Sequence, residues 1–363
     1  MSLIEVKGLK KSFGSLEVLK GIDLSVEQGE RIAIIGGSGC GKSVFLRSLC
    51  LLEKPDAGQI LIDGQEITAK GANVDRIRRS MGMVFQKFHL FSEMNVMDNL
   101  CLAPTRILRM PREDAEKKAM DLLSKVGLAS RAHDWPTVLS GGQQQRIAIC
   151  RCLMMEPKVL LFDEPTSALD PTMVGEVLAV IRMLAKRDMS MLIVTHEMNF
   201  ARAISNRVFY MDEGGIYEDG SPEQIFDHPL RENTRRFVRR LNVLELNIES
   251  RDYDFLSMAG RIETWCSRSQ VAPKLANRVQ LVFEETMQLL VPALENPRVL
   301  AVCEYSAQTE RAEWTLHYAG PRFDMISAGD GLALAVLKGM AQSMEYTWNG
   351  DAELPNQLQL VLR

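Results

Sequence analysis

Long hydrophobic runs are missing from this sequence. Its 363 residues contain no stretch that approaches the roughly 18 consecutive apolar residues of a membrane-spanning helix. The first residues, MSLIEVKGLKKSFG, also lack the apolar core of a secretory signal. Any role at a membrane is therefore expected to be peripheral.

Paired cysteines and an excess of one charge are missing as well. The seven cysteines are scattered, with no CxxC pair and no metal-type spacing, so we interpret them as reduced thiols of a cytosolic protein. The 43 basic and 47 acidic residues leave a net charge of −4, which offers no bulk attraction to nucleic acid. The remaining composition, 46% hydrophobic and 25% charged, is that of a globular protein, and the length predicts two domains.

A glycine-rich loop carries the strongest chemical signal. An apolar run over residues 32–35 leads into a loop of the pattern GxxxxGK[ST], after which Val44 opens a helical run. The loop residues are Gly36, Gly37, Ser38, Gly39, Cys40, Gly41, Lys42 and Ser43. In such a loop backbone N–H groups surround phosphate oxygens, Lys42 reaches the β- and γ-phosphates and the Ser43 hydroxyl binds Mg²⁺. The alternative, a glycine turn without a ligand, is the weaker one because strand and helix flank the loop.

Two carboxylates follow a second apolar run. Residues 159–162 end in Asp163 and Glu164, which predicts a buried parallel strand that delivers both acids where ligands bind in open α/β sheets. Asp163 suits the Mg²⁺ shell, and Glu164 can polarise a water for attack on the γ-phosphate. The alternative for either acid is a helix cap, which requires neither a second acid nor a metal.

A second anion site is predicted between these two motifs. Ser140, Gly141, Gly142 and Gln143 follow Leu139 and open a helical run. Ser140 can act as a simple N-cap. Two glycines inside a helix start each cost about 1 kcal/mol against alanine, so close approach of a ligand is the better explanation.

With these motifs, residues 1–245 resemble the ATP-binding subunits of ABC transporters, whose signature is LSGGQ. The resemblance implies a P-loop NTPase core of α/β class with a helical subdomain, which binds ATP and Mg²⁺. It also implies a homodimer in which two subunits pack head to tail, so that the signature of one chain contacts the ATP held by the P-loop of the other.

The resemblance assigns four further residues. Phe13 matches the aromatic residue that stacks on adenine, and Gln86 matches the glutamine that contacts Mg²⁺ and the attacking water. Asp170 ends the segment that lines the dimer seam, and His196 matches the switch histidine on the γ-phosphate. The alternatives are a core phenylalanine, a strand-end amide and a structural histidine.

The sequence between the motifs resembles more narrowly the ATPases of polar amino acid uptake systems. This closer resemblance lies in residues 51–55, 91–102, 157–171 and 195–198. This implies inner-membrane permease subunits as partners, an indirect link to a periplasmic or extracellular solute-binding protein, and a location at the cytoplasmic face of the cell membrane. Residues 87–91 and an amphipathic helix over 112–126 are expected to face the permease. Cys40 stands where the family usually has serine, and its thiol is a candidate for oxidation sensitivity.

The last part of the chain, residues 246–363, is an addition to that family pattern. After a short connection over 242–251, the pattern predicts helices at 253–267 and 271–290, strands at 299–305 and 314–318, a helix at 332–344, and strands near Tyr346 and at 358–362. This order predicts a two-layer α/β sandwich.

This region resembles the ATPase domain of histidine kinases and anti-sigma-factor serine kinases, through residues 281–285 and a glycine-rich box at 329–334. However, Leu289 replaces the Mg²⁺-binding asparagine of that family, and Tyr318 replaces its adenine-binding aspartate. We therefore expect a regulatory or interaction domain without ATP. Because of it, a second hypothesis stays open: a soluble switch ATPase that acts on a protein partner through this domain.

Overall fold

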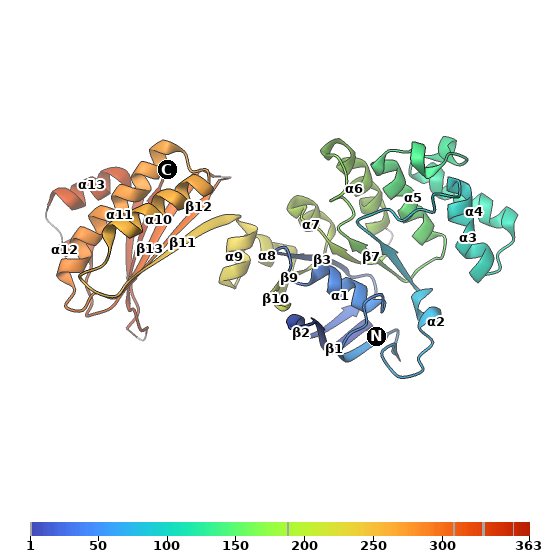
Figure 1. Cartoon of the computed structure of the whole chain (residues 1–363), viewed down its shortest axis with the longest axis horizontal. Coiled ribbons are helices and arrows are strands. Elements are labelled where there is room, and N and C mark those ends of the chain that lie inside the picture. Colours follow the sequence, from blue (N-terminus) through green and yellow to red (C-terminus); the bar gives the residue numbers. More distant parts are fainter. Residues whose placement is uncertain (1, 187–188, 308, 329–330, 351) are drawn as a thin grey trace. The chain divides into compact units, whose positions relative to one another are not determined.

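A computed structural model describes the chain except for residues 1, 187–188, 308, 329–330 and 351. The chain divides into two compact units, Met1–Arg235 and Arg236–Arg363 (Figure 1). In the described part of the chain, the first unit has two hydrophobic cores and the second has one. Among the described residues, no helix combines the length and the apolar character that crossing a membrane requires.

The first unit alternates strands and helices. In chain order these are β1 (Ser2–Phe13), β2 (Leu16–Glu27), β3 (Arg31–Gly36), α1 (Lys42–Leu49), β4 (Ala57–Ile62), β5 (Gln65–Glu66), α2 (Val74–Arg78), β6 (Met81–Val84), α3 (Val96–Ile107), α4 (Arg112–Lys125), α5 (Gly141–Leu153), β7 (Val159–Asp163), α6 (Pro171–Ala185), β8 (Ser190–Val194), α7 (Met198–Ile204), β9 (Arg207–Asp212), β10 (Gly215–Gly220) and α8 (Pro222–Asp227). The short helix α9 (Glu232–Val238) follows.

Two sheets organise this unit. One has the order β10-β9-β3-β8-β7-β6 and is parallel except for β10, and the other is the antiparallel sheet β2-β1-β4-β5. The strand β7 is buried along its whole length, and its residues alternate between two cores. Val159 and Leu161 face the core shared with the second sheet, whereas Leu160 and Phe162 face the core that contains α3 to α7. Because apolar layers cover both faces, the ligand-binding edge lies at the strand ends.

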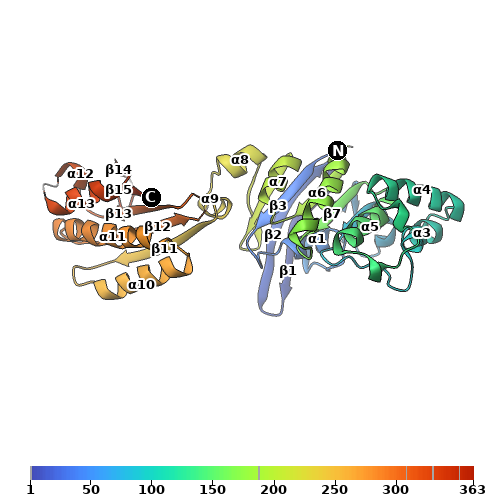
Figure 2. The same ribbon diagram turned by 90° about the horizontal axis from the view of Figure 1, so that it is seen from above.

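The helices α3, α4 and α5 gather at one end of the unit in both ribbon views (Figures 1 and 2). The core between them includes Leu100, Ala119, Leu123 and Ile147. These helices form the predicted helical subdomain, and the helix expected over 112–126 is present as α4.

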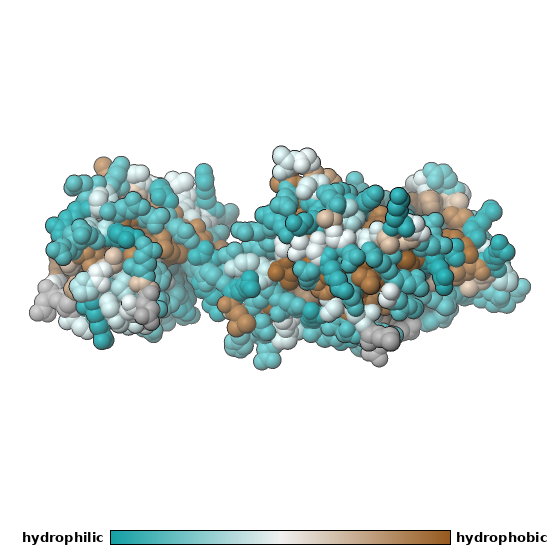
Figure 3. Space-filling view, turned by 90° about the horizontal axis from the view of Figure 1, so that it is seen from below, coloured by the Kyte–Doolittle hydropathy of each residue, from teal (hydrophilic) through white to brown (hydrophobic). Residues whose placement is uncertain are grey.

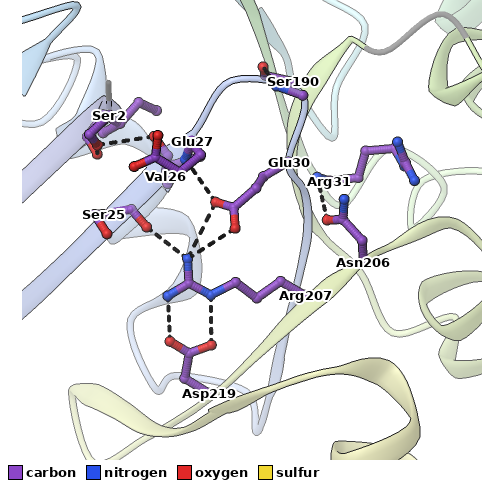
Figure 4. Close-up of polar contacts among 12 residues, drawn as sticks. Ser2, Ser25, Val26, Glu27, Glu30, Arg31, Ser190, Asn206, Arg207 and Asp219 are labelled. Carbon is purple, nitrogen blue, oxygen red and sulfur yellow. Dashed lines mark hydrogen bonds and ion pairs between the residues drawn. The ribbon is translucent and has the colours of Figure 1, made fainter.

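Arg207 ties the two sheets together (Figure 4). Its guanidinium on β9 donates to both carboxylate oxygens of Asp219 on β10, at 2.8 and 2.6 Å. It also donates to the Ser25 carbonyl on β2 at 2.8 Å and to the Glu30 carboxylate at 3.3 Å. A planar fork of donors suits this multiple contact, so one side chain joins strands from both sheets.

The second unit is a two-layer sandwich. Its strands are β11 (Leu241–Ile248), β12 (Val299–Ser306), β13 (Arg311–Tyr318), β14 (Ser343–Trp348) and β15 (Asn356–Leu362), paired antiparallel in the order β11-β12-β13-β15-β14. The helices α10 (Phe255–Arg268), α11 (Pro273–Ala293) and α13 (Leu332–Met340) and the short helix α12 (Met325–Ala328) share one core with alternate residues of these strands (Figure 1).

Two expectations for this unit were wrong. Residues 242–251 do not form a mere connection, because β11 occupies most of them and buries Leu244, Leu246 and Ile248 against the helices. The helix expected over 332–344 ends at Met340, and Ser343 already begins the edge strand β14. Of the expected glycine-rich box, Gly329 and Asp330 lie outside the described residues.

Candidate functional site

The glycine-rich loop joins β3 to α1 as predicted. Gly36, Gly39 and Gly41 have φ angles of 150°, 82° and 98°, which residues with a side chain rarely adopt. A Cβ at Gly36 would also lie 2.2 Å from the Met211 carbonyl oxygen, so this position requires glycine. Lys42 is buried, and its Nζ donates to the carbonyls of Gly36 at 2.9 Å and Gly37 at 2.6 Å. The loop therefore holds the Lys42 ammonium at the carboxyl end of β3, where loops of this kind bind phosphate.

Asp163 lies at the carboxyl end of β7 and is 1% exposed. Its Oδ1 accepts a hydrogen bond from the Ser43 Oγ at 2.5 Å, which joins the two predicted Mg²⁺ ligands. Its Oδ2 accepts two bonds from Arg47, from Nε at 3.1 Å and from Nη2 at 2.9 Å. The buried carboxylate is thus both paired and hydrogen-bonded, as a buried charge requires.

Sequence reasoning missed Arg47. Its position, four residues after Ser43 on α1, places both side chains on one helix face, and this spacing was the signal available. Arg47 is 46% exposed at its side chain, whereas Asp163 is 2% exposed, so the arginine covers the acid from the solvent side.

Glu164 and His196 meet directly. The Glu164 Oε1 lies 2.9 Å from the His196 Nε2. Glu164 has a φ of 49°, a left-handed conformation that non-glycine residues rarely adopt, and its N–H donates to the Val194 carbonyl at 3.1 Å. Strain of this kind is typical of functional sites. Since β7 and β8 run parallel, with Asp163 beside Val194, the acid and the histidine leave the sheet at the same edge.

Gln86 reaches this edge from the neighbouring strand. Val84 on β6 pairs with Phe162 on β7, so Gln86 and Glu164 each lie two residues beyond a paired position. Gln86 is exposed. Phe13 ends β1 with its ring 47% exposed, and the Lys11 Nζ lies 5.0 Å from its centre. This exposure leaves the ring accessible for stacking.

The signature residues open α5, away from the phosphate loop of the same chain. Ser140 is the N-cap and forms a capping box with Gln143. Among the described residues, no hydrogen bond or ion pair joins the signature to residues 36–44. Asp170 is exposed at the N-cap of α6 and its side chain does not bond to the helix.

The two signature glycines have a packing role that we did not expect. A Cβ at Gly141 would lie 3.0 Å from Leu169 and 3.3 Å from the Phe88 ring, and a Cβ at Gly142 would lie 3.1 Å from Met173. Close approach of side chains, and not only of a ligand, therefore favours glycine at both positions.

The surroundings of Cys40 disfavour its thiolate form. Burial raises the pKa of the thiol, although the Lys42 Nζ lies 3.7 Å from the sulfur and lowers the pKa in part. A thiol with a raised pKa carries little thiolate at neutral pH and is slow to oxidise. The environment therefore argues against the expected oxidation sensitivity.

A groove of about 770 Å³ lies beside the Gln86 loop, between β6, α3 and α5. Its lining includes Arg79, Met83, His89, Phe91, Ile107 and Arg151. Phe91 and Ile107 are 45% and 43% exposed. Hydrophobic surface is visible in Figure 3 over the end of the unit that carries α3 and α4.

Taken together, the loop, the paired acids and the histidine at one sheet edge define a P-loop nucleotide hydrolase. The ABC transporter family model matches residues 19–167. The arginine transport ATP-binding protein ArtM of Bacillus subtilis is 49% identical over 239 residues, which are 66% of this chain and all of that protein. The glutamine transport ATP-binding protein GlnQ of Geobacillus stearothermophilus is 46% identical over 64% of this chain and 96% of that protein. The chain therefore belongs to the ATP-binding subunits of ABC transporters and is an ATPase.

Solved structures of ABC transporter ATP-binding proteins support the same family assignment. The chain is similar to CbiO1 of Clostridium perfringens, part of an ABC transporter complex, with a TM-score of 0.57 and 31% identity over 62% of this chain and 90% of that one. It is also similar to the dimeric cassette MJ0796 bound to ADP and Pi, with a TM-score of 0.56 and 32% identity over 60% of this chain and 98% of that one. The predicted P-loop NTPase fold is confirmed, and subunits of this family dimerise and work with membrane permeases. About a third of the chain is additional to ArtM.

Proposed function

We propose that this chain hydrolyses ATP to power the import of a polar amino acid through a permease of the inner membrane. The observation that carries the proposal is the junction of Ser43 with Asp163 and of Glu164 with His196 at one sheet edge. The relatives named as arginine and glutamine transport ATP-binding proteins support the substrate class and favour a transporter over the soluble switch ATPase.

The residues at this edge fit a Mg²⁺ ion that arrives with ATP. Ser43 and Asp163 offer a hydroxyl and a carboxylate held 2.5 Å apart. No cluster of three His, Cys, Asp or Glu side chains suited to a metal occurs among the described residues, so phosphate oxygens would complete the shell. The bound ion would neutralise charge that develops on the phosphates.

Each side chain of the site would have a separate role. Lys42 moves from the loop carbonyls to the β- and γ-phosphates, while Glu164 orients the attacking water and accepts its proton. His196, which lies 2.9 Å from the Glu164 carboxylate, would contact the γ-phosphate, and Gln86 would help to hold the ion and the attacking water. Phe13 stacks on adenine, and the loop from Gly36 to Val44 surrounds the phosphates.

A second copy completes each site. Among the described residues, no hydrogen bond or ion pair joins residues 140–143 to the phosphate loop of the same chain, which supports action on the ATP of the opposing chain. Asp170 would lie at the seam between the copies. Closure on ATP and opening after hydrolysis would then move the permease.

The groove beside Gln86 is where we place the permease. Its exposed phenylalanine and isoleucine would receive an apolar cytoplasmic segment of that partner. The subunit would thereby lie at the cytoplasmic face of the membrane, with a solute-binding protein on the opposite side.

The second unit, which contains residues 246–363, would regulate the motor and bind no nucleotide. Tyr318 is fully buried and its hydroxyl donates to the Phe323 carbonyl at 2.6 Å. Asn356 is buried beside it and bonds to the carbonyls of Tyr318, Gly320 and Pro321. Leu289 packs against the same core. This buried, hydrogen-bonded turn includes Tyr318, which the resemblance aligns with the adenine-binding aspartate, and it supports a domain that binds no nucleotide.

The test is co-purification. A tagged Glu164→Gln chain, isolated from gently solubilised native membranes with ATP, should bring down a polytopic permease in stoichiometric amount. Recovery of soluble proteins alone, retained only when residues 246–363 are present, would favour the switch ATPase instead.

A further inference from the structure

One face of the Phe13 ring is already occupied by a cation. The Lys11 Nζ lies over this ring, 5.0 Å from its centre, which is within the range of a cation–π contact. The ring is nevertheless 47% exposed. A flat base can therefore stack on the face opposite the ammonium, which solvent reaches.

The segment of residues 53–56 holds Lys11 in this place. The Lys11 Nζ donates to the Lys54 carbonyl at 2.7 Å and pairs with the Glu53 and Asp56 carboxylates at 2.9 and 3.5 Å. Its side chain is 12% exposed. The hydrogen bond with Glu53 and the charge of Asp56 raise the pKa of Lys11, so the ammonium stays charged at neutral pH. Lys11 is thus a fixed cation and not a mobile surface charge.

Asp56 also fixes the backbone that leads to the ring. Its Oδ2 accepts a hydrogen bond from the Ser12 N–H at 2.6 Å, and its own N–H donates to the Lys10 carbonyl at 2.9 Å. The residues on both sides of Lys11 are therefore bonded to Asp56. Phe13 follows directly and ends β1, so the position of its ring depends on this network.

The same segment is bonded to the helix that begins at the phosphate loop. This helix, α1, starts at Lys42. The N–H groups of Leu52 and Glu53 donate to the Arg47 carbonyl in its last turn, at 3.0 and 3.3 Å. Because a short helix is rigid, Lys11 links the ring to the phosphate loop through the far end of α1.

We propose that Lys11 is a positioning residue for recognition of the base. It holds the Phe13 ring on its inner face, so that adenine stacks on the outer face at a fixed distance from the phosphate loop. The affinity for the base then depends on Lys11, whereas the affinity for the phosphates does not. The inference rests on the proposed function, because it takes Phe13 as the residue that stacks on adenine.

The experiment compares two ligands on the full chain by calorimetry. ATP carries the base, and inorganic tripolyphosphate carries phosphates alone. Lys11→Met keeps most of the side-chain length without the charge. It should raise the Kd and the KM for ATP about three- to fivefold, and leave kcat and the Kd for tripolyphosphate within about twofold. Unchanged binding of tripolyphosphate also shows that the phosphate loop is still folded.

Two further variants separate position from general stability. Lys11→Arg keeps a cation that can pair with Glu53 and Asp56, and it should return the Kd for ATP to within about twofold of the unmodified chain. The matched control is Lys7→Met. Lys7 lies on the same strand and pairs with Glu5 at 3.3 Å, so its loss should leave the Kd for ATP within about twofold.

A double variant tests whether Lys11 acts through the ring. Phe13→Ala should raise the Kd for ATP at least about fivefold, because stacking on the base is lost. Adding Lys11→Met to Phe13→Ala should change this Kd less than about twofold, since no ring is left to position.

The proposal is overturned if Lys11→Met weakens ATP and tripolyphosphate equally, if the losses multiply in the double variant, or if Lys11→Met has no effect where Phe13→Ala does. No effect of Phe13→Ala would overturn the adenine assignment of Phe13 as well. Since no permease is present, each of these failures is distinct from failure of the co-purification.

Discussion

The two units of this chain treat polar groups in opposite ways. At the sheet edge of the first unit, Gln86 and His196 are exposed and Glu164 is partly exposed, while Asp163 is buried but held by Ser43 and Arg47. In the second unit, the polar groups at the turn around Asn356 bond to one another, with Asn356 fully buried and its described amide bonds directed to backbone and to Tyr346.

This difference shows why architecture alone does not define activity. Both units combine a sheet with helices, yet the described turn around Asn356 uses its hydrogen bonds internally, whereas the sheet edge of the first unit presents polar groups that a ligand can reach. Function follows from the site and not from the fold.

Nucleotide binding by the second unit would contradict this difference between the units. Lys42→Ala removes the buried cation of the phosphate loop and should abolish ATP binding by the full chain. Equilibrium dialysis of the unmodified chain should give one ATP per chain. Residual stoichiometric binding in the variant would locate a second site outside the loop.

Loss of the general base should stop turnover without stopping binding. Glu164→Gln is expected to lower kcat about 100- to 10,000-fold, because the amide cannot accept the proton from water. ATP should then accumulate in a closed dimer, which size-exclusion chromatography detects. A chain that stays monomeric in saturating ATP would contradict the head-to-tail arrangement.

Core disruption in the second unit should leave the first intact. Trp314 is fully buried and its Nε1 donates to the Val279 carbonyl at 3.0 Å. Trp314→Ala is expected to destabilise this unit by about 3–5 kcal/mol. Calorimetry should show one transition moving to lower temperature while the ATP-stabilised transition stays, and a shift of both would mean that the units fold together.

A variant that perturbs the first unit instead is Arg207→Met, which removes the ion pairs of Arg207 with Asp219 and Glu30 (Figure 4). Because these groups are partly exposed, the expected loss is about 1 kcal/mol. Urea unfolding should show it only in the transition that ATP shifts. An unchanged midpoint would mean that the network adds nothing to stability.

The smallest effect concerns Cys40. Since burial raises its pKa, the thiolate forms only at higher pH than in a free cysteine, and alkylation should accelerate in that higher range. ATP should slow the reaction further by covering the loop. Rapid labelling at neutral pH with loss of ATPase would restore the oxidation-sensitive interpretation.

Much of the first unit could be predicted because its motifs are local. The strand before Gly36, the glycines and the helix after Lys42 lie within one short segment, and the order of residue types fixes their geometry. The strand β11 was missed although Leu244, Leu246 and Ile248 alternate, because the expected family boundary outweighed the period-two pattern.

The sequence by itself determined which groups carry the chemistry: a phosphate loop, two acids, a histidine and a signature, since each is a short pattern of residue types. Tertiary structure alone decided which groups meet. The contacts of Asp163 with Arg47, of Glu164 with His196, and of the Phe85 carbonyl with Gln145 join segments distant in the chain or on different elements. Such contacts depend on how strands align and helices pack, which local patterns do not encode.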